Sequence, residues 1–97
     1  MAPKNNLAST LHFALAAELR EMRVLVETLA EQLLADESFV LAHAEALQGF
    51  DLLVQHADEA AVLLDRIAQG SCVREAVAAV RLDSVQTRLR AALMAAA

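Results

Sequence analysis

The residues with the clearest chemical potential lie in one polar row of a long helical segment. Gln48, Asp51, Gln55 and Asp58 recur at spacings of three and four, which places them on one face of a helix. Asp51 and Gln55 are one turn apart, so their side chains reach the same region of solvent. A carboxylate and an amide on a rigid helix can bind an ammonium group and orient a water molecule.

Three histidines and one cysteine are the other candidates, and their signals are weaker. His12 and His43 lie on apolar helical faces and could approach each other. No carboxylate at ligand spacing accompanies them or His56, so we expect no metal site. Cys72 is the single cysteine, which excludes an internal disulfide, and we interpret it as structural.

Length, composition and charge define the class of protein. The 97 residues are 58% hydrophobic, include two glycines and one proline, and show no strand-like alternation, which predicts one all-α domain over residues 1–97. A net charge of −5 with scattered basic residues argues against nucleic-acid binding. The apolar runs are too short for a membrane span and no secretory signal is visible, so we expect a cytoplasmic protein.

The hydrophobic pattern predicts two long helices. A frayed lead-in over residues 1–8 precedes the first helix, over residues 9–34, and the second covers residues 38–69. The apolar stripe of the first helix alternates by four and three and contains Leu15, Leu19, Met22, Val26, Leu29 and Leu33. The second helix has two adjacent apolar rows, one of which contains Leu53. A short connection between the helices predicts an antiparallel hairpin.

The segment after Gly70 is expected to form two shorter helices. Gly70 suits the left-handed position that ends a helix, and Ser71 is the next cap. We predict helices over residues 72–81 and 83–94, with a capping box at the start of the second. A single continuous helix is the alternative.

The amount of apolar surface predicts assembly. Two long helices and a short pair carry more apolar side chains than one hairpin can shield from water. The simplest arrangement is a homodimer in which two hairpins complete a four-helix bundle. A monomeric bundle, with the C-terminal pair folded back, is the competing arrangement.

The stretch Asp51-Leu52-Leu53-Val54-Gln55 resembles the Asp-x-x-x-Gln motif of the CheZ-type chemotaxis phosphatases, which include small CheT-like proteins. The resemblance implies long antiparallel helices, paired in a dimeric four-helix bundle, that dephosphorylate the response regulator CheY. It also implies two roles. Gln55 would orient the water that attacks the regulator's aspartyl phosphate, and Asp51 would pair with the regulator's active-site lysine.

The resemblance further implies what a CheY-like partner contributes. Phosphoryl transfer needs positioning and charge neutralisation, and the regulator would hold Mg²⁺, so this chain would need no cofactor of its own. Gln48 and Asp58, on the same polar face, are the expected partner-binding residues. The alternative function is a non-catalytic helical adaptor or dimerisation module, in which the apolar faces serve assembly and Gln55 has no particular role.

Overall fold

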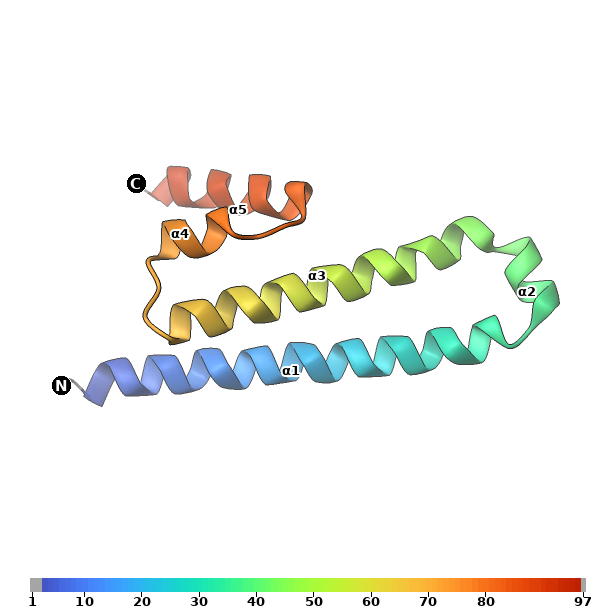
Figure 1. The fold of residues 1–97 in the computed structure, drawn as a ribbon, viewed down its shortest axis with the longest axis horizontal. Coiled ribbons are helices and arrows are strands. Elements are labelled where there is room, and N and C mark those ends of the chain that lie inside the picture. Colours follow the sequence, from blue (N-terminus) through green and yellow to red (C-terminus); the bar gives the residue numbers. More distant parts are fainter. Residues whose placement is uncertain (1–2, 97) are drawn as a thin grey trace.

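The computed structural model describes residues 3–96, with side chains from residue 7 onward, as an elongated set of five helices (Figure 1). These residues contain no strand, so the predicted all-α class is confirmed. The two longest helices, α1 (Pro3–Leu34) and α3 (Ala44–Ala68), pack side by side in antiparallel directions, which confirms the predicted hairpin. None of the described helices has the length and apolar character needed to cross a membrane.

Helix α1 begins earlier than the sequence suggested. Residues 3–8, expected to belong to a frayed lead-in, are helical, whereas residues 1 and 2 lie outside the described residues. A proline is compatible with the first turn of a helix, because the N–H that it lacks would have no partner there. The boundary expected at residue 9 is therefore wrong.

The helix predicted over residues 38–69 is instead two helices, α2 (Glu37–Ala42) and α3, with a break at His43. The His43 backbone leaves the helical region, with φ −129° and ψ 29°, and its ring lies 4.5 Å from the ring of Phe39 between centroids. Asp36 caps α2 by accepting a 3.1 Å hydrogen bond from the backbone N–H of Phe39. Because the chain must reverse direction here, α2 runs across the gap between α1 and α3 (Figure 1).

Helix α3 ends in a Schellman motif at Gly70. This residue has φ +97°, the left-handed conformation expected of it. Its N–H donates to the carbonyl of Ile67, and the N–H of Ser71 donates to the carbonyl of Arg66, both at 3.0 Å. The cap expected from Ser71 is wrong, because Cys72 holds the N-cap position of the next helix.

The last segment forms two short helices, α4 (Val73–Ala78) and α5 (Asp83–Ala96), with α4 against α3 and α5 against α4 (Figure 1). The capping box expected at the start of α5 is not formed. The Gln86 amide instead donates to the carbonyl oxygens of Ala78 at 2.8 Å and Val80 at 3.1 Å. Because the last carbonyls of a helix lack partners within it, this side chain ties α5 to the end of α4.

The core is thin and consists of small side chains. Ala16 on α1 and Ala61 on α3 are fully buried, and small residues allow two helices to approach closely. Val77 and Val80 are buried around α4. No large side chain among the described residues is fully buried, which agrees with a shortest dimension of 17 Å.

The face that α1 turns toward α3 is not the centre of the predicted stripe. Leu15, Met22 and Leu29 are 44%, 56% and 49% exposed. The protected side of α1 contains the other three residues of that stripe, Leu19, Val26 and Leu33, which are half-buried, together with buried Ala16 and half-buried Arg23. The helix is therefore rotated about its axis relative to the expectation, and half of the predicted stripe faces outward.

Candidate functional site

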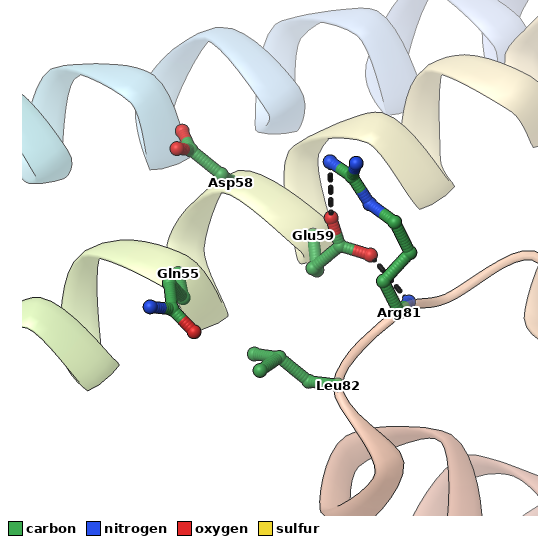
Figure 2. Close-up of a pocket in the computed structure, with 5 residues that line it drawn as sticks. All are labelled: Gln55, Asp58, Glu59, Arg81 and Leu82. Carbon is green, nitrogen blue, oxygen red and sulfur yellow. Dashed lines mark hydrogen bonds and ion pairs between the residues drawn. The ribbon is translucent and has the colours of Figure 1, made fainter.

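A cavity of about 340 Å³ lies between α3 and the loop that joins α4 to α5 (Figure 2). Its lining residues are Gln55, Asp58, Glu59, Arg81 and Leu82. In Figure 2 the Leu82 side chain points toward Gln55. Gln55, which was predicted to be catalytic, and Asp58, which was predicted to bind the partner, therefore lie beside a segment more than twenty residues further along the chain.

Glu59, which was not among the residues predicted from the sequence, anchors this loop. Glu59 is only 8% exposed, and its carboxylate accepts the backbone N–H of Arg81 at 2.6 Å. The Arg81 guanidinium lies 3.4 Å from the same carboxylate, but that side chain is 87% exposed. A buried carboxylate needs such partners, and the short backbone bond is the stronger of the two. No local signal in the sequence identifies Glu59, because its partner lies 22 positions further along the chain.

Asp51 and Gln48 border a different cavity on α3. It has a volume of about 270 Å³, lies toward α2 and also includes Leu34 and Phe50. The four residues that the sequence placed on one polar face are thus divided between two cavities. Residues of α1 line the cavity beside Asp51, and residues of the α4–α5 loop line the cavity beside Gln55.

Arginines of α1 bind two aspartates of α3. Arg20 donates a 2.5 Å hydrogen bond to the Asp65 carboxylate. Arg23 Nε lies 3.4 Å from Asp58, whose side chain points toward α1 (Figure 2). Both ion pairs link α1 to α3 on the polar side of the hairpin. The carboxylate of Asp58 is therefore partly engaged within the chain.

Asp51 and Gln55 are not engaged in this way. Both are exposed, and within residues 7–96 neither side chain makes a hydrogen bond or an ion pair. They stand one turn apart on the same helix, which gives them a common direction. An unpaired carboxylate and an unpaired amide are consequently available to a molecule that approaches α3.

The histidines and the cysteine are dispersed. His43 lies at the hairpin turn and His12 near the opposite end of the antiparallel pair, so the expected approach of these two residues is wrong. His56 is half-buried, and its Nε2 has no hydrogen-bond partner in the described part of the chain. Cys72 is free and exposed. Across the residues that the structure describes, no three His, Cys, Asp or Glu side chains form a group that could hold a metal ion.

No protein-family model, curated protein or solved structure matches this chain. Its functional candidates are therefore its own side chains, first of all the exposed pair of Asp51 and Gln55.

Proposed function

We propose that the protein binds a phosphorylated CheY-like response regulator and promotes hydrolysis of its aspartyl phosphate. The observation that carries this proposal is the unengaged pair of Asp51 and Gln55, both exposed and one turn apart on the 25-residue helix α3. A long helix keeps the spacing of two side chains fixed while they enter a partner's active site. The resemblance to the Asp-x-x-x-Gln motif supports the same conclusion.

In the proposed reaction the Gln55 amide orients a water molecule toward the phosphorus of the regulator's phosphoryl group. The water oxygen forms a new P–O bond while the bond to the aspartyl oxygen breaks, which yields inorganic phosphate and a free carboxylate. Asp51 pairs with a lysine of the regulator, and Gln48 and Asp58 contact the regulator nearby. The regulator holds Mg²⁺, so this chain contributes geometry and no cofactor.

Gln55→Ala should abolish the acceleration of phosphate release, because no other amide would hold the attacking water. The side chain is exposed, so the stability should change by less than about 0.5 kcal/mol. Asp51→Ala should instead raise the concentration of protein needed for half-maximal acceleration. The measurement is phosphate release from a CheY-like regulator loaded with a small phosphodonor, with and without each variant.

Gln32→Ala is the matched control, since Gln32 is an exposed glutamine on α1, outside both cavities. It should accelerate release as the wild type does. If the wild-type chain accelerates release from none of the organism's regulators, the phosphatase proposal is wrong and the adaptor function is the better explanation.

The exposed apolar surface of α1 favours that second function, a non-catalytic adaptor or dimerisation module. The outward residues recur at helical spacing and form what we call the α1 stripe: Leu7, Leu11, Leu15, Met22, Leu25 and Leu29, each at least 44% exposed. The stripe spans 23 residues of helix, which corresponds to about 33 Å. Exposed apolar side chains on this scale favour protein–protein contact.

We further propose that this contact is a homodimer in which two hairpins complete a four-helix bundle. The interface of this dimer includes exposed apolar residues of both long helices, and Leu53 on α3 is 51% exposed. Leu53→Asp should therefore change the stability of an isolated chain little but place an unpaired carboxylate in the dimer interface. Light scattering should give twice 10.4 kDa for the wild type and the monomer mass for this variant.

Leu41→Asp serves as the control for this experiment, because Leu41 is 84% exposed in α2 at the hairpin turn. This variant should remain dimeric. A wild-type chain that is monomeric at micromolar concentration and melts cooperatively would contradict the dimer.

A further inference from the structure

The charge of the chain is divided unevenly between its two parts. Residues 71–97 contain four arginines and two acidic residues, a net charge of +2, although the whole chain carries −5. The long hairpin is therefore strongly acidic and the α4–α5 pair is basic. A separation of this kind directs an acidic partner toward the basic part.

The basic part contains a groove of about 220 Å³ between α4 and α5. Val77, which is 4% exposed, and Leu93, which is half-buried, contribute apolar surface to it. Arg74 from α4 and Arg90 from α5 also line the groove, one from each helix. The hydrogen bonds from Gln86 to the end of α4 hold the two helices together, so the groove exists before any partner binds.

The two groove arginines carry unpaired charge. Arg20, Arg23 and Arg81, by contrast, each lie within 4 Å of a carboxylate. Arg74 and Arg90 have no ion pair within residues 7–96, and no acidic residue lines the groove. Two unpaired guanidinium groups beside apolar surface are complementary to carboxylates beside an aliphatic side chain.

We propose that this groove binds an acidic amphipathic segment of a partner protein. An aliphatic side chain of that segment packs against Val77, Leu93 and Met94, while its carboxylates pair with Arg74 and Arg90. A polyanion such as a nucleic acid fits less well, because two arginines neutralise few phosphates and the apolar surface would stay unused. The inference is independent of the phosphatase activity, since it involves neither Asp51 nor Gln55.

The test uses the full chain and a blocked helical peptide in which leucines recur every three or four residues and are flanked by glutamates. Amide resonances of α4 and α5 should shift on titration. Arg90→Glu should weaken binding by about tenfold or more, because a repulsive charge replaces an attractive one in the groove. Arg74→Glu, on the other helix, should have the same effect.

Arg88→Glu is the matched control, because Arg88 is exposed on α5, does not line the groove and undergoes the same change of charge. It should bind the peptide nearly as the wild type does. Peptides with serine in place of leucine, or lysine in place of glutamate, should bind at least about tenfold more weakly.

Three results would overturn the inference. The first is that the α4 and α5 resonances do not shift on titration. The second is that Arg88→Glu weakens binding as much as Arg90→Glu, because this would indicate attraction by net charge alone. The third is that the peptide fails to bind while Arg90→Glu lowers the mass measured by light scattering. The groove would then be occupied by a second copy of the chain.

Discussion

Glu59→Ala should lower the free energy of unfolding by about 1–3 kcal/mol and release the α4–α5 pair from the long hairpin. The substitution removes the acceptor that lies 2.6 Å from the backbone N–H of Arg81, and a part-buried donor without a partner carries a cost of this size. Because α5 is attached mainly through α4, loss of the anchor should loosen both helices. Chemical denaturation followed by circular dichroism measures the stability, and amide hydrogen exchange of α4 and α5 measures the release.

Arg81→Ala distinguishes the contribution of the backbone hydrogen bond to stability from the contribution of the ion pair. It leaves the N–H of residue 81 bound to Glu59 and removes only a 3.4 Å contact of a side chain that is 87% exposed. An ion pair this exposed contributes less than about 1 kcal/mol, so Arg81→Ala should be much milder than Glu59→Ala. Equal losses of stability for the two variants would show that the guanidinium, and not the backbone, is the main anchor.

Gly70→Ala should destabilise the protein by about 1–2 kcal/mol, because Gly70 has φ +97° and a Cβ is unfavourable in the left-handed region. A Cβ at this position would meet no atom within 4 Å. The expected cost therefore comes from the backbone conformation and not from a steric clash with neighbours. The measurement is again the free energy of unfolding in a chemical denaturant.

Gly49→Ala is the matched comparison and should have the opposite sign. Gly49 lies inside α3, has no positive φ, and a Cβ there would also meet nothing within 4 Å. Alanine within a helix is more stable than glycine by about 0.5–1 kcal/mol. If Gly70→Ala stabilised the protein as Gly49→Ala does, the Schellman ending of α3 would be contradicted.

The local features of this fold were readable from the sequence because they depend on neighbouring residues. The four-and-three spacing of apolar residues determines that the chain is helical and that two long helices pair. Asp36 and Gly70 mark the start of α2 and the end of α3 through contacts within a few residues of themselves. The adjacency of Asp51 and Gln55 is local in the same sense, since one helical turn separates them. The break at His43 was missed, because the direction of α2 depends on the gap that it must bridge.

The rotation of α1 was decided by tertiary structure. The predicted stripe is divided between two faces of the helix. Leu15, Met22 and Leu29 are exposed, whereas Leu19, Val26 and Leu33 are half-buried on the side of Ala16 and Arg23. Burial of Ala16 brings the helices close together, and the same rotation places Arg23 beside an aspartate of α3. The apolar periodicity does not determine which face of α1 packs against α3. It reports the hydrophobicity of each face and not how well that face fits the partner helix.

The cavity beside Gln55 was also decided by tertiary structure. It exists because the loop after α4 returns to α3, where the N–H of Arg81 meets Glu59 across 22 positions of the chain. In the sequence, Glu59 is one more charged residue near a polar helix face, and nothing local distinguishes a solvated carboxylate from a buried anchor. Burial depends on the path of the distant segment, in which Val77 and Val80 are themselves buried.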